Sequence, residues 1–166
     1  FAERSLIDQV TTQRANGGVV IVLDVHTGDI LAMANVGAPD RTGYAQLAGP
    51  TDVNLAATGV YEPGSTNKVI TIATALDSDS CDVTPDSGFN VPWRIINGDA
   101  YIKDNSQHAE QWWTTRDILA KSSNVGTSMI AERCLTPTTM HAAMRNFGYG
   151  TRTNLGLGEP NGLLIP

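Results

Sequence analysis

A serine and a lysine stand three residues apart in Tyr61-Glu62-Pro63-Gly64-Ser65-Thr66-Asn67-Lys68-Val69-Ile70, the stretch around which the chain is organised. Pro63-Gly64 predicts a tight turn that delivers Ser65 to the first turn of a helix. The spacing places the Ser65 hydroxyl and the Lys68 amine on one face of that helix. A lysine with a lowered pKa can take the proton of a serine, and a helix N-terminus favours a developing oxyanion. Ser65 is therefore a candidate nucleophile, and Lys68 is its candidate base.

Other interpretations of this stretch are possible. A Ser-x-x-Lys pair is a weak signal, because most chance examples lie on a solvated helix face. Gly59 and Gly64 have the spacing of a phosphate-binding loop, but that loop needs a lysine directly after the second glycine, where this chain has Ser65. The predicted helix is apolar almost all round and should be buried in the centre of the domain. Such a helix must present Ser65 and Lys68 to a cavity, because unpaired polar groups are costly to bury.

A second polar cluster, Ser122-Ser123-Asn124, lies at a predicted break between two helices. From this break Ser122 could pass a proton to a leaving amine, and Asn124 could hold Lys68 or a substrate amide. The alternative is that Ser122 or Ser123 caps the following helix and Asn124 only assists, because serine and asparagine are preferred cap residues. The residues alone leave both interpretations open.

The rest of the chain has the pattern of one mixed α+β domain. We expect helices over residues 2–14, 65–76, 115–120, 125–133 and 137–147, the third of them opened by a capping box from Thr114 to Asp117. Two β-branched runs, residues 19–25 and 30–36, predict a hairpin apolar enough for the buried centre of a sheet. Asn97-Gly98 predicts a small satellite hairpin. Residues 37–58 predict a long surface loop.

The composition argues against several classes of function. The 166 residues contain 11 Lys and Arg against 17 Asp and Glu, a net charge of −6, and no basic run suits a nucleic-acid partner. No apolar run is long enough to span a membrane. Two cysteines without a Cys-x-x-Cys and three scattered histidines do not predict a metal site, and no cofactor is expected. Cys81 and Cys134 are either two thiols or one disulfide formed in an oxidising compartment.

Together the two polar clusters resemble the signature of the penicillin-binding protein transpeptidases. The resemblance is to class B, monofunctional enzymes and covers nearly the whole chain, including residues 20–34, which look like the family's first hairpin, and residues 153–166. Asn67 departs mildly, since a bulky apolar residue is commoner there. The resemblance implies an α+β fold of the penicillin-binding protein and serine β-lactamase type. A helical cluster and part of an antiparallel sheet would be present, with the N-terminal hairpin but without the C-terminal strands.

The resemblance also implies a mechanism. Ser65 would be acylated by the D-Ala-D-Ala end of peptidoglycan stem peptides and by β-lactams, with Lys68 as its base. Ser122 and Asn124 would form the second motif, and the Ser65 N–H would give half of the oxyanion hole. Further substrate-binding residues are expected beside the motifs: Glu62, Gly64, Thr66 and Ser123. The implied location is the extracytoplasmic face of the bacterial membrane, and the implied partners are cell-division or elongation proteins.

The family's third motif, Lys-Thr-Gly or Lys-Ser-Gly, does not occur in the sequence. We therefore expect residues 1–166 to be a partial transpeptidase domain, excerpted from a longer protein, with the third-motif half and the membrane anchor outside this sequence. The remaining half of the domain is then a required partner. One alternative is a serine β-lactamase or β-lactam sensor, which would need a deacylating base such as Glu110. The other is a non-catalytic structural fragment in which Ser65 is inert.

Overall fold

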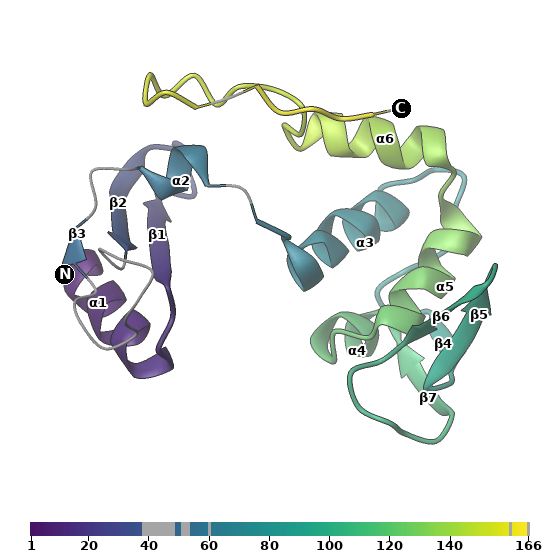
Figure 1. The fold of residues 1–166 in the computed structure, drawn as a ribbon. Coiled ribbons are helices and arrows are strands. Elements are labelled where there is room, and N and C mark those ends of the chain that lie inside the picture. The colour runs from purple at the N-terminus through teal and green to yellow at the C-terminus, as the bar shows by residue number, and fades with distance from the viewer. Residues whose placement is uncertain (38–48, 51–53, 60, 160, 166) are drawn as a thin grey trace. The chain divides into compact units, whose positions relative to one another are not determined.

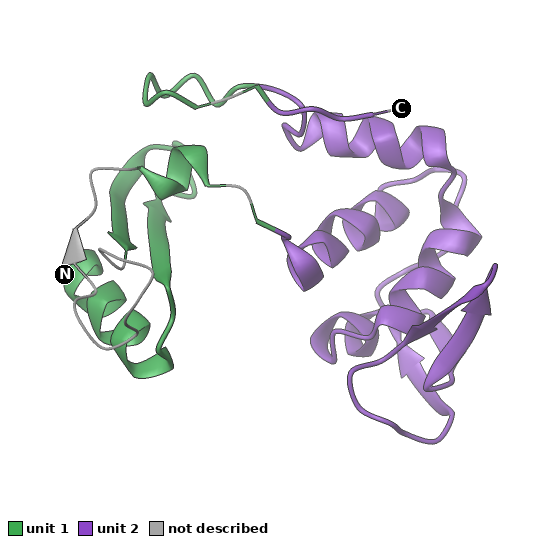
Figure 2. Ribbon diagram, viewed as in Figure 1, with its two compact units in different colours: residues 1–61, 152–161 green, residues 62–151, 162–166 purple. Residues whose placement is uncertain are grey.

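The computed structural model describes residues 1–37, 49–50, 54–59, 61–159 and 161–165 (Figure 1). The chain divides into two compact units, coloured separately in Figure 2. Unit 1 comprises residues 1–61 and 152–161, and unit 2 comprises residues 62–151 and 162–166. Most of the loop predicted over residues 37–58 lies outside the described residues.

Unit 1 contains the predicted first helix and hairpin. Its elements are α1 (Ala2–Gln13), β1 (Gly17–Leu23), β2 (Ile30–Gly37), the short β3 (Gly49–Pro50) and α2 (Leu55–Thr58). β1 and β2 pair antiparallel with Val20 opposite Ala34, and the strand order is β1-β2-β3. The Asp24 carboxylate accepts hydrogen bonds from the backbone N–H groups of His26 and Thr27, which closes the turn between the two long strands.

Helix α1 ends earlier than predicted. It stops at Gln13, because Arg14 adopts a left-handed backbone with φ 52°. Gly17 and Gly18, shortly after the helix, begin β1. A Cβ on Gly18 would lie 3.0 Å from side-chain atoms of both Leu6 and Val10, so the missing side chain lets α1 pack closely on the strand.

The hairpin is confirmed, but the prediction that it is a buried sheet centre is wrong for this chain. β1 lies at the edge of the described sheet. Val19, Ile21 and Leu23 of β1 are 41%, 44% and 52% exposed, respectively. The apolar residues 19–23 therefore make β1 suited to burial, but the described residues do not cover it. An edge strand with free N–H and C=O groups can accept a further strand.

Unit 2 is a helical cluster with two small antiparallel sheets. Its elements are the 3-10 helix η1 (Gly64–Asn67), α3 (Lys68–Leu76), β4 (Gly88–Val91), β5 (Arg94–Asn97), β6 (Ala100–Lys103), β7 (Gln111–Thr114), α4 (Thr115–Ala120), α5 (Asn124–Cys134) and α6 (Pro137–Asn146). Its core includes Ile72 of α3, Ile118 of α4 and Ile130 of α5. Val69 and Leu76 of α3 are exposed, so the prediction that this helix is enclosed on all sides is wrong. The neighbours of α3 in this unit, α4, α5 and α6, leave part of its surface open.

The predicted capping box and the satellite hairpin are both present. Thr114 and Asp117 form the predicted capping box, in which each side chain accepts a hydrogen bond from the backbone N–H of the other residue. β5 and β6 form the satellite hairpin, although its two central residues are Gly98 and Asp99, because Asn97 pairs with Ala100. Gly98 has φ 59°, a conformation that glycine adopts without steric cost.

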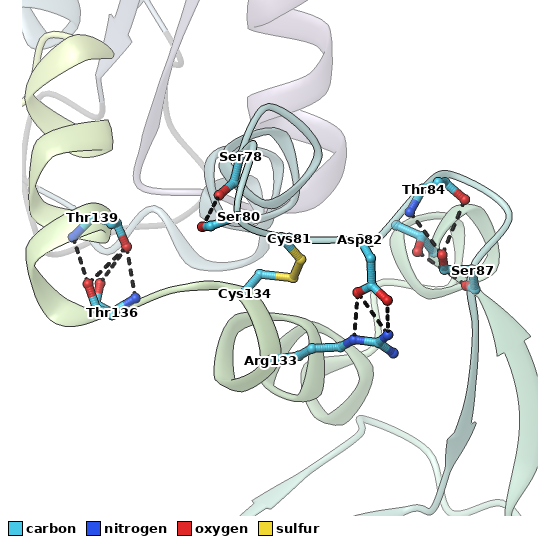
Figure 3. The surroundings of a disulfide bond; sticks show 11 residues. Ser78, Ser80, Cys81, Asp82, Thr84, Ser87, Arg133, Cys134, Thr136 and Thr139 are labelled. Carbon is cyan, nitrogen blue, oxygen red and sulfur yellow. Dashed lines mark hydrogen bonds and ion pairs between the residues drawn. A yellow bond between two sulfur atoms is a disulfide. The ribbon is translucent and has the colours of Figure 1, made fainter.

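A disulfide joins Cys81, in the segment after α3, to Cys134 at the end of α5 (Figure 3). The two Cα atoms lie 5.2 Å apart. Beside the disulfide, the Arg133 guanidinium donates hydrogen bonds of 2.7–3.1 Å to both carboxylate oxygens of Asp82. Of the two possibilities that the sequence left open for the cysteines, the structure has the disulfide.

Candidate active site

Ser65 lies in the 3-10 turn η1, which runs directly into α3. Gly64 before it has φ 56°, the left-handed conformation that glycine tolerates best. The Thr66 hydroxyl donates a 2.5 Å hydrogen bond to the carbonyl oxygen of Pro63 and so closes the turn. The tight entry predicted from Pro63-Gly64 is therefore confirmed, and Ser65 is exposed at the start of the helix.

Lys68, the first residue of α3, connects the two polar clusters. Its Nζ donates a 3.0 Å hydrogen bond to Ser122 Oγ and a second hydrogen bond to the carbonyl oxygen of Ser122. Burial lowers the pKa of Lys68, and the negative charge of Asp104 opposes part of this shift. The structure thus brings together two clusters that lie 54 residues apart in the sequence.

Ser122 and Ser123 have different roles in the helix break. Ser122 has φ 56°, and it follows α4 where a glycine is usual. Its N–H donates to Leu119 O and that of Ser123 donates to Ile118 O, both at 3.0 Å, which is the paired hydrogen-bond pattern of a Schellman motif. Ser123 is the N-cap of α5, since its Oγ accepts a 2.8 Å hydrogen bond from Gly126 N–H. The capping interpretation therefore applies to Ser123, whereas Ser122 is bonded to Lys68.

A cavity of about 550 Å³ opens beside these residues. Its lining consists of Ser65, Asp104, Asn105, Ser106, His108, Trp113, Lys121, Ser122 and Asn124. The Asn124 side-chain amide donates a 2.8 Å hydrogen bond to the carbonyl oxygen of Lys103. Of the four further residues predicted to bind substrate, Glu62, Gly64, Thr66 and Ser123, none belongs to this lining, and neither does Glu110.

The comparisons with known proteins identify the family of the chain. A family model described as the penicillin-binding protein transpeptidase domain matches residues 18–164. The chain belongs to this transpeptidase family. The resemblance to class B penicillin-binding proteins is confirmed, and so is an α+β fold of the transpeptidase type.

Two curated penicillin-binding relatives and one solved structure show how much of a family member is present. The chain is 38% identical over 153 residues to penicillin-binding protein PbpB of Mycolicibacterium smegmatis, covering 88% of this chain and 22% of the relative. It is 37% identical over 162 residues to peptidoglycan D,D-transpeptidase FtsI of Escherichia coli K12, and this match covers 96% of this chain and 26% of the relative. Penicillin-binding protein 3 of Mycobacterium tuberculosis, in complex with aztreonam, superposes with a TM-score of 0.81 at 32% identity over 99% of this chain and 37% of that one. The chain thus spans about a quarter of the length of these curated relatives.

Two residues of this candidate site were not predicted from the sequence. The Asp104 carboxylate, 7% exposed, accepts hydrogen bonds from Ser123 Oγ, Val125 N–H and His108 Nε2. Burial acts to raise the pKa of Asp104, but these hydrogen bonds outweigh burial and hold the pKa below its ordinary value. The carbonyl oxygen of Ala109 and the Asp104 carboxylate raise the pKa of His108. No motif or spacing in the sequence marks either residue, and the only local signal is that Asp104 comes shortly after the hairpin predicted at Asn97-Gly98.

Within the described residues no cluster of His, Cys, Asp and Glu side chains is suited to a metal ion. Among these residues no helix has the length and apolar character needed to cross a membrane.

Asn67, where the chain departs from the penicillin-binding protein pattern, has its own partner. Its Oδ1 accepts a 2.6 Å hydrogen bond from the Tyr149 hydroxyl. We predict that Tyr149→Phe in the complete protein lowers the free energy of unfolding, measured by urea titration, by about 1 kcal/mol, because the part-buried amide oxygen loses its donor. Tyr101→Phe is the control, since it removes a hydroxyl from an exposed tyrosine of the same unit. Equal unfolding free energies for the two variants would contradict a stabilising role of the hydrogen bond.

Proposed function

We propose that the complete protein is a peptidoglycan D,D-transpeptidase that is acylated at Ser65 by D-Ala-D-Ala stem peptides and by β-lactams. The observation that carries this proposal is the pair of hydrogen bonds from Lys68 Nζ to Ser122, beside a cavity that Ser65 lines. It is supported by the family membership, by a relative that is itself named a peptidoglycan D,D-transpeptidase, and by a structural neighbour that binds aztreonam.

Acylation begins with proton transfer from Ser65 to Lys68. A neutral lysine amine has two N–H groups and one lone pair. Its two N–H groups can serve the hydroxyl and the carbonyl oxygen of Ser122, as in the observed hydrogen bonds, which leaves the lone pair free to accept the Ser65 proton. The lowered pKa of Lys68 increases the fraction of neutral amine at neutral pH.

The remaining steps complete the proposed acyl transfer. Ser65 Oγ attacks the carbonyl carbon of the penultimate D-Ala, and the Ser65 N–H stabilises the oxyanion together with a second donor from the third-motif strand. The C–N bond then breaks, the leaving nitrogen takes a proton from Ser122, and Lys68 returns a proton to Ser122. The amine of a second stem peptide then attacks the ester carbonyl, the new C–N bond forms as the bond to Ser65 Oγ breaks, and the proton that the amine loses returns to Ser65 Oγ through Lys68. A β-lactam acylates Ser65 in the same way, but its leaving nitrogen stays attached to the adduct.

We propose further that residues 1–166 are part of the transpeptidase domain, and that the third-motif half of the same domain supplies strands for the edge of β1. The exposed apolar side chains of β1 support this assignment. Asn124 would hold a substrate amide, while Glu62, Gly64, Thr66 and Ser123 would shape the borders of the substrate site. The protein would act at the extracytoplasmic face of the bacterial membrane with cell-division or elongation proteins. The disulfide supports an oxidising compartment.

Labelling with a fluorescent penicillin tests the proposed function. In the complete protein we expect one covalent adduct, located on the peptide that contains Ser65, and no adduct with Ser65→Ala, because the nucleophilic oxygen is gone. Ser80→Ala is the control, since it removes an exposed serine hydroxyl of the same unit outside the cavity. A folded wild-type protein that takes no label, or a Ser65→Ala variant that is labelled normally, would contradict the proposal.

A further inference from the structure

Asp104 follows β6 and caps the start of α5 from outside that helix. Its Oδ1 accepts a 3.0 Å hydrogen bond from Val125 N–H, and Ser123 Oγ lies 2.8 Å and 3.0 Å from its two carboxylate oxygens. The Ser123 hydroxyl itself accepts from Gly126 N–H. Two otherwise unpaired N–H groups of the first helical turn are thereby satisfied, one by a carboxylate and one by a hydroxyl that the carboxylate orients.

The neighbour of Asp104 holds the next residue of the same turn. The Lys103 carbonyl oxygen accepts from the Asn124 side-chain amide at 2.8 Å. Two consecutive residues at the end of the hairpin, Lys103 and Asp104, therefore fix three consecutive residues, 123–125, at the start of α5. Ser123, which is 2% exposed, is held on both sides and has little freedom to move.

This anchoring determines where Ser122 lies. Ser122 precedes the anchored residues, and its left-handed backbone places both its hydroxyl and its carbonyl oxygen within reach of Lys68 Nζ. A rotation of the peptide between Ser122 and Ser123 would displace the carbonyl oxygen, and a shift of Ser123 would displace the hydroxyl as well. Displacements of about 1 Å can cost catalysis on the order of 100-fold even when they arise away from the reacting atoms.

We propose that Asp104 is a positioning residue for acylation, which holds Ser123 and the first turn of α5 so that Ser122 stays bonded to Lys68. This inference rests on the proposed function. Asp104 acts through Ser123 and not on the substrate carbonyl, and its carboxylate also places a negative charge near the general base.

The charge gives the inference a pH signature that a purely structural role lacks. The charged groups that face Asp104 are Lys68 and His108, and Lys121 in turn faces His108. The Asp104 charge raises the pKa of Lys68 against the larger effect of burial, so its removal lowers the pKa of Lys68 further. Because the neutral amine is the active base, acylation then begins at a lower pH.

The test compares Asp104→Asn with wild type in the complete protein, using the rate of fluorescent-penicillin acylation measured from about pH 5 to about pH 9. Asparagine keeps the shape and loses the charge. We expect acylation slowed by about tenfold or more, with the acid limb of the profile moved to lower pH. Ser123→Ala should slow acylation without shifting the acid limb of the pH–rate profile, since the Asp104 carboxylate and its charge remain. Asp86→Asn is the control, because it neutralises an exposed carboxylate of the same unit that pairs with Arg116.

The outcomes separate this inference from the proposed function. A wild-type protein without a Ser65 adduct would contradict the proposed function. If the wild type is labelled but Asp104→Asn is acylated at a rate within about twofold of wild type, only the role of Asp104 is overturned. The same holds if the acid limb of the pH–rate profile of Asp104→Asn is not shifted. If Asp104→Asn does not fold, as judged by near-UV circular dichroism, Ser123→Ala decides, and a Ser123→Ala rate within about twofold of wild type overturns the inference.

Discussion

Lys68→Ala in the complete protein lowers the rate of penicillin acylation about 10²–10⁴-fold, the range expected when a general base is removed. In the proposed mechanism the proton of Ser65 then loses its acceptor and Ser122 loses its proton source, because Lys68 is the side chain that bonds to Ser122 among the described residues. The measurement is the second-order rate constant for labelling by a fluorescent penicillin, with the fold checked by circular dichroism.

Two further variants define the role of Lys68. Lys68→Arg keeps a positive charge and hydrogen-bond donors but cannot give up its proton at neutral pH, so it should be about as slow as Lys68→Ala. Arg145→Ala removes an exposed cation of the same unit and should leave the rate unchanged. A Lys68→Arg rate near that of wild type would show that Lys68 supplies charge rather than basicity.

Removal of the disulfide has the largest expected effect on stability. The double variant Cys81→Ser, Cys134→Ser should lower the free energy of unfolding of the complete protein by about 4 kcal/mol, because the bond closes a loop between cysteines 53 residues apart and restricts the unfolded chain. Urea denaturation measures this change. Reduction of the wild-type protein should move its midpoint to that of the double variant.

The ion pair beside the disulfide provides the matched control. Arg133 and Asp82 bond to each other next to Cys134 and Cys81, but both side chains are largely exposed. Asp82→Asn should therefore change the unfolding free energy by no more than about 1 kcal/mol. If the double cysteine variant has the same midpoint as wild type before and after reduction, the disulfide does not stabilise the protein.

The features that could be predicted from the sequence depend on residues close together in the chain. The capping box of Thr114 and Asp117, the glycine turn at Gly98 and the helical entry of Ser65 each involve neighbours within a few residues. Such features follow from backbone geometry and hydrogen-bonding groups that a short segment carries with it.

Contacts between distant residues could not be predicted in the same way. β4 pairs with β7, and Asp104 bonds to Ser123 across 19 residues. Neither contact could be predicted, because neither produces a periodic pattern of residues in the sequence. The role of the second cluster was left open for a related reason. Whether Ser122 or Ser123 caps α5 depends on the orientation of the peptide between them. In this orientation Ser122 bonds to Lys68 and Ser123 bonds to Asp104, and both partners are distant in the sequence.

The left-handed backbone conformation of Ser122 affects which amino acids this position can accept. A left-handed conformation suits glycine better than any residue with a side chain, so replacing the serine by glycine would relieve steric cost of about 1 kcal/mol. The same replacement would remove the hydroxyl that Lys68 contacts. Thermodynamic stability and chemical competence therefore favour different residues at one position, and retention of serine there marks a trade-off between the two.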